Sequence, residues 1–433
     1  MRVLFVTIPW TSHFNQMVPL AWALRSAGHE VRVASEPNFL DTITEAGLTA
    51  VPAGSDETLK QRVRRMLGGE ATQGQVDSPF FDSLYEIDDG HRDGLPWEAI
   101  TWVLNTLVVP QMWILNDEMV DDLVTYCRHW QPDLVLCDAL THAGAVAADA
   151  VGAAHARMLF GSDPYLRMRR DFLRAKERQP GECPDTMRDW YAEWARKYGR
   201  DFTEELVTSQ FAVNVLPERC RLEPHERTLS LRYVPYNGHS VVPSWLYGAP
   251  RAPRVLVTFG ITSWGWADRE TISAEQVQEI LDSLADLDIE LVLTLPGEAR
   301  ELLRGVPENT RIEEFIPLDV ILPTCAAVVH HGGGGSFNGA MLHGIPQLLL
   351  TYAADAPAKR TVLRQTGAGL SIAPDEVTGP RVRASLTRLL EDDAIRAGAE
   401  RFQQETLAHP TPSALVPDLE RLTAELRSPR AHG

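Results

Sequence analysis

A run of four glycines, Gly332 to Gly335, lies between a histidine pair and a serine in the segment AAVVHHGGGGSFNGAM at 326–341. The pattern predicts a strand that ends in glycines and leads into a helix, with Ser336 as the capping residue. N–H groups at a helix N-terminus stabilise negative charge, and glycines let a diphosphate approach the main chain closely. A plain strand-to-helix turn is the alternative, but four successive glycines would weaken its packing. We therefore predict an anion site, although the glycine spacing fits neither the dinucleotide fingerprint nor the lysine-containing phosphate loop.

Asp355 follows another strand-like run, PQLLLT at 346–351, and should lie at the carboxyl edge of the sheet beside the glycines. A carboxylate at that edge could bind a sugar hydroxyl. A ribose-binding acid of a nicotinamide enzyme would occupy a similar place, and a solvated loop aspartate is a third interpretation. Asp355 alone does not decide between them.

His13 and Asp138 are candidates for acid–base chemistry in the first half of the chain. His13 lies in the loop PWTSHFN at 9–15, and Asp138 ends the run DLVLCD at 133–138. Both should emerge at the carboxyl edge of a parallel sheet, where ligands usually bind. Imidazole titrates near neutrality and a carboxylate could orient it, as in a triad whose nucleophile is an acceptor oxygen. A surface histidine without a catalytic role is the alternative.

The pair Asp286-Leu-Asp288 superficially matches the Asp-x-Asp pattern of metal-dependent nucleotide-sugar enzymes. It precedes the strand-like run 289–295 and should therefore lie at the amino edge of the sheet, opposite the expected ligand crevice. We predict that no metal is required.

Three tryptophans, Trp97, Trp102 and Trp113, have roughly helical spacing in an apolar stretch, with Pro110 marking a kink or break. Core packing is the default interpretation. They could also form an apolar wall for a flat or macrocyclic ligand, because sites for such ligands are lined mainly by aromatic and aliphatic groups.

The elements that would position these residues alternate between strands and helices. At the N-terminus the strand-like runs 2–8 and 30–35 flank a helical pattern at 16–27, which Gly28 could cap. This order predicts an α/β fold with two doubly wound parallel sheets of Rossmann type. Further strand-like runs lie at 133–137, 156–160, 254–259, 289–295, 326–330 and 346–351.

The length and the prolines predict two domains and a connection. Two less regular stretches, 60–97 and 162–205, would be solvated loops or contacts to ligands and partners. The predicted division is an N-terminal domain over 1–234, a linker over 235–253, a second domain over 254–409, and a C-terminal helical segment over 410–433 that packs back on the first domain.

The composition excludes several classes of partner. The 41 Lys and Arg residues against 59 Asp and Glu give a net charge of −18, which would repel nucleic-acid backbones and anionic membranes. The five cysteines are scattered without a CxxC pair, so neither a disulfide framework nor a cysteine zinc site is expected. No run approaches the ~20 apolar residues of a spanning helix. We therefore expect a cytoplasmic protein that binds neither nucleic acid nor a membrane.

Taken together, these residues resemble those of the two-domain nucleotide-sugar glycosyltransferases of the GT-B fold, in the inverting family that includes plant and macrolide glycosyltransferases. The most specific matches are the motif at 330–336 and the Ser-His loop followed by VPLAWALRSAGHEV at 18–31. The chain is most similar to the antibiotic- and polyketide-tailoring deoxysugar transferases typified by erythromycin desosaminyltransferase, through 232–245 and 322–326. The resemblance spans almost the whole chain and implies two domains that face an interdomain cleft.

The resemblance implies transfer of a deoxysugar or aminodeoxysugar from a thymidine diphosphate (TDP) sugar to a hydroxyl of a polyketide, macrolide or aromatic aglycone. Inversion would occur without a metal or a bound cofactor, with His13 as the base and Asp138 as its partner. Ala356 stands where many relatives carry a glutamine that binds sugar hydroxyls, which suits a sugar that lacks them. Phe315, an aromatic residue that matches a donor-site position of the family, would stack on thymine. The positions that match the family's donor site are Thr262, Phe315, His331, Gly333, Gly334, Gly335, Ser336 and Asp355.

Several members of this subgroup work with a helper protein that resembles a cytochrome P450. The resemblance therefore implies such a partner on the N-terminal domain, with 60–97 and 162–205 as candidate docking surfaces, and a homodimer is a further expectation. Two other functions stay open, namely a sugar-nucleotide epimerase on the same fold and a non-catalytic sugar-nucleotide-binding helper. The tryptophan-rich segment disfavours the epimerase, and the presence of both His13 and the glycine motif disfavours the non-catalytic protein.

Overall fold

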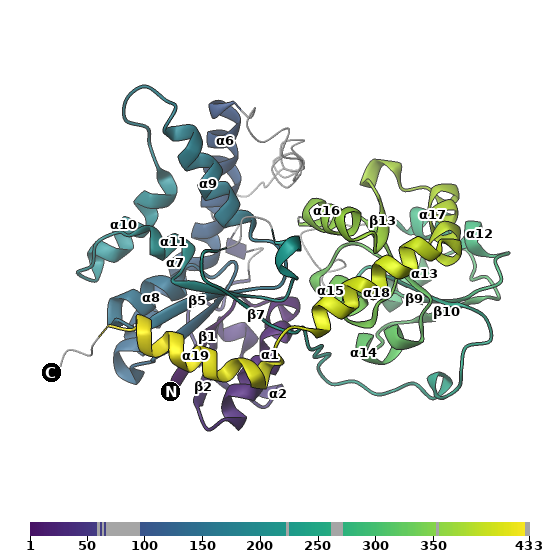
Figure 1. Cartoon of the computed structure of the whole chain (residues 1–433), viewed down its shortest axis with the longest axis horizontal. Coiled ribbons are helices and arrows are strands. Elements are labelled where there is room, and N and C mark those ends of the chain that lie inside the picture. Colours follow the sequence, from purple (N-terminus) through teal and green to yellow (C-terminus); the bar gives the residue numbers. More distant parts are fainter. Residues whose placement is uncertain are drawn as a thin grey trace. The chain divides into compact units, whose positions relative to one another are not determined.

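The computed structural model describes residues 1–58, 61–62, 65, 96–221, 225–260, 272–351 and 355–428. Within this part the chain forms two compact units, each built around its own sheet (Figure 1). The first unit combines Met1–Val234 with Pro410–Gly433, and the second is Pro235–His409.

The described residues of the first unit form a seven-stranded parallel sheet in the order β3-β2-β1-β4-β5-β6-β7. β1 and β4 are buried along almost their whole length, as expected for strands covered by helices on both faces. The strands are β1 (Arg2–Val6), β2 (Glu30–Ser35), β3 (Thr49–Pro52), β4 (Leu134–Asp138), β5 (Ala154–Leu159), β6 (Phe211–Asn214) and β7 (Thr228–Ser230).

Helices cover both faces of this sheet (Figure 1). The long helix α7 packs against α8, and the last helix, α19, packs against α1 and β5. The helices are α1 (Thr11–Ser26), α2 (Leu40–Glu45), α6 (Trp97–Val103), α7 (Val109–Trp130), α8 (Ala143–Val151), α9 (Pro164–Lys176), α10 (Thr186–Lys197), α11 (Glu204–Thr208) and α19 (Pro412–Leu426), with short 3₁₀ turns η1 (Pro37–Phe39) and η4 (Glu218–Cys220).

The junction between α6 and α7 is a π-helical turn, η3 (Leu104–Val108), rather than an interruption. Pro110 lies in the first turn of α7. Because its ring removes one backbone donor, the preceding turn widens and the chain stays helical through 97–130.

The prediction of an irregular stretch over 162–205 was wrong, because this stretch contains α9, α10 and α11. Arg169 lies on the inner side of α9, is almost fully buried, and pairs with Asp185 at 2.6 Å and with Glu204 at 2.5 Å. Asp163 and Asp185 accept backbone hydrogen bonds as the N-caps of α9 and α10. Buried arginines interrupt the apolar periodicity by which these helices could have been recognised.

The described residues of the second unit form a six-stranded parallel sheet in the order β10-β9-β8-β11-β12-β13. Its strands are β8 (Arg254–Thr258), β9 (Glu290–Thr294), β10 (Thr310–Glu313), β11 (Ala327–His330), β12 (Gln347–Leu350) and β13 (Gly369–Ile372). Its helices are α12 (Ala274–Leu284), α13 (Gly297–Glu301), α14 (Leu318–Ile321), α15 (Gly334–His343), α16 (Ala356–Thr366), α17 (Gly379–Glu391) and α18 (Asp393–Leu407), with 3₁₀ turns η5 (Ser244–Tyr247), η6 (Leu322–Thr324) and η7 (Pro374–Glu376).

The order of both sheets reverses at one place, between β1 and β4 in the first unit and between β8 and β11 in the second. The prediction of two doubly wound parallel sheets is therefore confirmed. In such sheets ligands bind outside the carboxyl ends of the strands at the point of reversal. At the two reversal points the strands end at Val6 and Asp138 in the first sheet and at Thr258 and His330 in the second. A ligand is therefore expected near the residues that follow these four.

Candidate active site

His13 and Asp138 meet at the reversal point of the first sheet. His13 lies in the first turn of α1, which begins at Thr11, so the expected loop over 9–15 is shorter than predicted. Asp138 is the last residue of β4, which pairs with β1. His13 Nδ1 lies 3.5 Å from Asp138 Oδ1, so the structure brings these two residues together.

The Asp138 carboxylate is fully buried and held by donors on both of its oxygens. Oδ2 accepts hydrogen bonds from the Thr7 hydroxyl at 3.1 Å and from the Ile8 amide at 3.0 Å, and Oδ1 accepts one from the Leu140 amide at 2.6 Å. Burial by itself raises the pKa of Asp138, but His13 and the backbone donors outweigh burial, so its pKa lies below the ordinary value. Asp138 is therefore an anion at neutral pH.

Aromatic rings flank His13 on the described part of the chain. Trp10 contacts its ring edge-on at 5.2 Å between centroids, and Phe160 lies at 6.4 Å. Neither residue is among the site residues that the sequence predicted. Trp10 stands three positions before His13, and Phe160 follows β5, which pairs with β4. Their position after neighbouring strands was the signal that could have identified them.

The three tryptophans proposed for the acceptor wall lie in different surroundings. Trp97 is half-buried against the core of the first unit and packs on Phe172 of α9, with ring centroids 5.4 Å apart. Trp102 and Trp113 are 42% and 39% exposed. The structure therefore packs the half-buried Trp97 against the core and leaves Trp102 and Trp113 at the surface.

The glycine motif lies at the reversal point of the second sheet, between β11 and α15. The helix begins at Gly334 with Gly333 as its N-cap, so the prediction that Ser336 caps it was wrong. Glycine is accepted at this position, and the Phe337 amide makes the first helical hydrogen bond, to the Gly333 carbonyl at 3.0 Å. Ser336 lies buried in the first turn. The N–H groups of Gly334, Gly335 and Ser336 therefore belong to the part of the helix that has no partner within the helix.

His331 packs between two glycines. A Cβ at Gly333 would lie 2.7 Å from His331 Cε1, and a Cβ at Gly260 would lie 2.6 Å from the same atom. Gly260 follows β8, so the loops at the reversal point close around the imidazole. Burial lowers the pKa of His331 to about 4, and the Lys359 charge adds to the lowering. His331 is therefore a neutral hydrogen-bond donor or acceptor at pH 7.

His330 has a bracing role within the motif. Its Nδ1 accepts a hydrogen bond from the Gly332 amide at 3.1 Å, which leaves Nε2 to donate to Gln347 Oε1 at 2.9 Å. Burial lowers its pKa to about 3, with His331 and Lys359 adding to the effect. The two adjacent histidines thus differ, because His330 fixes the glycine loop from inside the sheet and His331 lines the loop.

Asp355 precedes α16 directly as its N-cap, after the strand β12. Its carboxylate pairs with the buried Lys359 at 2.6 Å, and Lys359 also donates to the Gly332 carbonyl. The structure therefore joins Asp355 to the glycine loop through Lys359, which is not among the predicted site residues. The sequence feature that could have identified it is a single lysine four residues after Asp355.

The remaining donor-site predictions fall on the same unit. Phe315 follows β10 and is 43% exposed, which leaves its ring accessible for stacking. Thr262 lies outside the described residues.

Asp286 lies before β9 and forms a two-armed ion pair with Arg383 of α17. Its carboxylate therefore serves to attach that helix. In the described ranges, no group of three or more His, Cys, Asp or Glu side chains is arranged to hold a metal ion.

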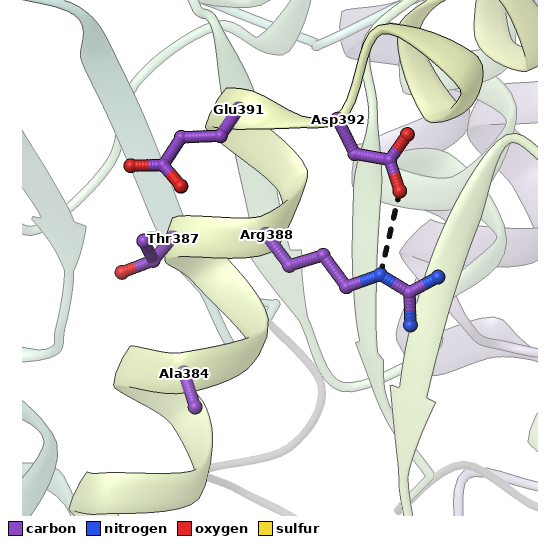
Figure 2. A pocket seen from close by; sticks show the side chains of 5 residues that line it. All are labelled: Ala384, Thr387, Arg388, Glu391 and Asp392. Carbon is purple, nitrogen blue, oxygen red and sulfur yellow. Dashed lines mark hydrogen bonds and ion pairs between the residues drawn. The ribbon is translucent and has the colours of Figure 1, made fainter.

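A shallow surface pocket of about 380 Å³ lies at the end of α17, lined by Ala384, Thr387, Arg388, Glu391 and Asp392 (Figure 2). Figure 2 shows the Arg388–Asp392 ion pair along one side of it. None of the proposed site residues lines this pocket. Among the described helices, none has the length and apolar character needed to cross a membrane.

Comparison with known proteins places the chain in a family. The N-terminal and C-terminal domains described as erythromycin biosynthesis protein CIII-like match residues 22–260 and 278–422. The 10-deoxymethynolide desosaminyltransferase of Streptomyces venezuelae is 42% identical over 100% of this chain and 99% of its own length. The aklavinone 7-beta-L-rhodosaminyltransferase of Streptomyces galilaeus is 41% identical over 100% and 98%.

The fold agrees with a solved structure of the same kind. The glycosyltransferase VinC, crystallised in complex with DTDP, superposes with a TM-score of 0.84 at 36% identity, covering 98% of this chain and 100% of its own. The chain therefore belongs to the erythromycin biosynthesis protein CIII-like family and is a glycosyltransferase of the GT-B fold.

Proposed function

We propose that this chain transfers a deoxysugar from a TDP sugar to a hydroxyl of a polyketide aglycone, with inversion and with His13 as the general base. The relatives named above are a desosaminyltransferase named for 10-deoxymethynolide and a rhodosaminyltransferase named for aklavinone, and VinC was crystallised in complex with DTDP. The observation that carries the mechanism is the contact between His13 and the buried Asp138 carboxylate at the sheet reversal.

The reaction is a single displacement. Asp138 faces Nδ1 of His13, which leaves Nε2 to take the proton of the acceptor hydroxyl. The acceptor oxygen forms a bond to the anomeric carbon while the bond from that carbon to the diphosphate oxygen breaks, and TDP leaves with the electron pair. Asp138 stabilises the imidazolium that results. Trp10 and Phe160 supply apolar surface beside the base for the aglycone.

Charge that develops on the diphosphate is stabilised by groups that are already in place. The first-turn N–H groups of α15 act as hydrogen-bond donors, in the manner of an oxyanion hole, and the neutral His331 imidazole packs beside them in the loop. On this proposal no metal is needed, and turnover persists in the presence of a chelator.

The test is a mass-spectrometric assay of the purified protein with TDP and UDP deoxysugars and with macrolide and anthracycline aglycones. We expect a product heavier by one deoxysugar with a TDP donor, with a β-linkage from an α-donor by NMR. His13→Ala should lower kcat by about 10²–10⁴-fold, the usual contribution of a general base. Ser26→Ala, at the exposed end of the same helix, is the matched control.

Each assay is run with and without a cytochrome P450-like helper protein, and sedimentation tests the homodimer. Retention of the anomeric configuration, or full activity of His13→Ala, would contradict the mechanism. Donor consumption without an acceptor would favour the epimerase instead.

A further inference from the structure

Lys359 is a buried cation attached to the glycine loop. It is 4% exposed and lies one helical turn after Asp355 in α16. Its Nζ donates to the Gly332 carbonyl at 2.5 Å and to Asp355 Oδ2 at 2.6 Å. The same ammonium group lies 6.0 Å from the ring centre of Phe337 in α15. One side chain therefore connects the loop, the helix that follows it and the aspartate beside it.

The choice of lysine here is distinctive for this chain. Of 41 basic residues only four are lysines, and Lys359 is the sole lysine after residue 197. Arginine carries a wide planar fork, whereas an ammonium group is a compact point charge that fits between a carbonyl and a carboxylate. The site therefore uses lysine, although nearly all other basic residues of the chain are arginines.

The ion pair is unequal in its exposure to water. The Asp355 side chain is 39% exposed, whereas the Lys359 side chain is 5% exposed. Water screens the carboxylate more strongly than the ammonium group, so the pair leaves a net positive potential on its buried side, where it contacts Gly332. The effect reaches His331, because burial lowers the pKa of that imidazole and the Lys359 charge lowers it further. A neutral His331 supplies no formal charge, so among the residues that the structure describes Lys359 is the cation in contact with this loop.

We propose that Lys359 is a positioning residue of the donor site: it fixes the glycine loop and the Asp355 carboxylate, and its charge strengthens the binding of a nucleoside diphosphate at that loop. The inference rests on the proposed use of a TDP donor. It assigns to a buried lysine a share of the charge compensation that a cation supplies in other nucleotide-sugar sites.

Calorimetric titration with TDP and with thymidine separates the diphosphate from the nucleoside. Lys359→Gln keeps a donor but loses the charge, and we expect TDP affinity to fall about tenfold or more. Thymidine affinity should change less than about twofold, because thymidine does not reach the loop with a charged group. Lys359→Arg keeps the charge but not the compact shape, so it should lose less of the preference for TDP over thymidine than Lys359→Gln does. Arg364→Gln, at an exposed position of the same helix, is the control that should bind like the wild type.

A second variant has an expected effect of the opposite sign. Asp355→Asn removes the negative partner and leaves the ammonium charge uncompensated, so TDP should bind about two- to fivefold more tightly, as expected for one partly screened charge. Structural damage could only weaken binding, so this variant keeps the test decisive if Lys359→Gln fails to fold.

Parallel losses of TDP and thymidine affinity in Lys359→Gln, or weaker TDP binding by an Asp355→Asn variant that keeps the wild-type thymidine affinity, would overturn the inference. Wild-type protein that binds TDP in this way but transfers no sugar would contradict the proposed function alone. Wild-type protein that does not bind TDP would overturn both.

Discussion

Asp138 Oδ1 lies 3.5 Å from His13 Nδ1, with the carboxylate fully buried and the imidazole side chain 23% exposed. The negative charge therefore lies beside Nδ1 and away from water, while the ring itself stays accessible. This arrangement resembles the orienting pair of a triad. The contribution of each residue to catalysis can therefore be measured by mutating one of them at a time.

Asp138→Asn should lower kcat by about 10²–10³-fold, because the amide cannot stabilise an imidazolium as a carboxylate does. Stability should fall as well, since one amide oxygen replaces two oxygens that accept from Thr7, Ile8 and Leu140. Thr7→Val is the control, because it removes one donor at a cost of about 1 kcal/mol and keeps the charge. Steady-state kinetics and thermal unfolding of both variants check this. Equal kcat values for the two variants would exclude a catalytic role for the Asp138 charge.

Gly333→Ala should weaken TDP binding about tenfold, because the added methyl would lie 2.7 Å from His331 Cε1 and push the ring out of the loop. In a His331→Ala background the methyl has room, so the same substitution should then cost little. Gly305→Ala, whose methyl meets no atom within 4 Å, should leave TDP binding unchanged. The measurement is a double-mutant cycle by calorimetry, and additive effects would contradict the predicted contact.

Phe315→Ala should lower the affinities for TDP and for thymidine by the same factor, since both contain the base. Stacking of an aromatic ring on a base contributes about 1–3 kcal/mol, which corresponds to about five- to a hundredfold in affinity. Leu302→Ala, which alters another exposed apolar side chain of the same unit, is the control. A loss seen for TDP but not for thymidine would assign Phe315 to the diphosphate or to loop structure instead of to the base.

The pH dependence of stability should carry the signature of buried neutral histidines. Burial lowers the pKa of His155 to about 4, from an ordinary value near 6.5. Between these two values the unfolded chain binds a proton that the folded chain does not, so stability falls as the pH drops from 6.5 to 4. His142, His330 and His331, whose pKa values burial also lowers, act in the same direction.

His155→Met should therefore reduce the loss of unfolding free energy between pH 6.5 and 4 by on the order of 1–3 kcal/mol. His155 Nδ1 has no hydrogen-bond partner in the described part of the chain, so the substitution should cost little at pH 7.5. Denaturant unfolding at pH values from 7.5 to 4.5 measures the effect. Parallel curves for the variant and the wild type would show that this histidine is not buried as a neutral group.

Much of the architecture follows from local sequence patterns. The runs at 2–8, 133–137 and 326–330 were recognisable as strands because parallel strands buried on both faces are nearly continuous apolar segments. A glycine run after such a strand is a local signal for an anion site, and it lies at the carboxyl edge as predicted. The capping residue was misassigned because Gly333 and Ser336 are both acceptable N-caps, and only the backbone conformation chooses between them.

The tertiary structure decided which of these residues act together. His13 meets Asp138 because β1 pairs with β4, a long-range contact that local pattern does not encode. The burial of Lys359 likewise depends on a long-range contact, the packing of α16 against the loop after β11. The helices of 162–205 bury arginines that pair with acidic residues of other helices, as Arg169 does with Asp185. A sequence displays the period of each element, but the burial of a charge depends on partners from distant segments, and those partners are fixed only when the sheet assembles.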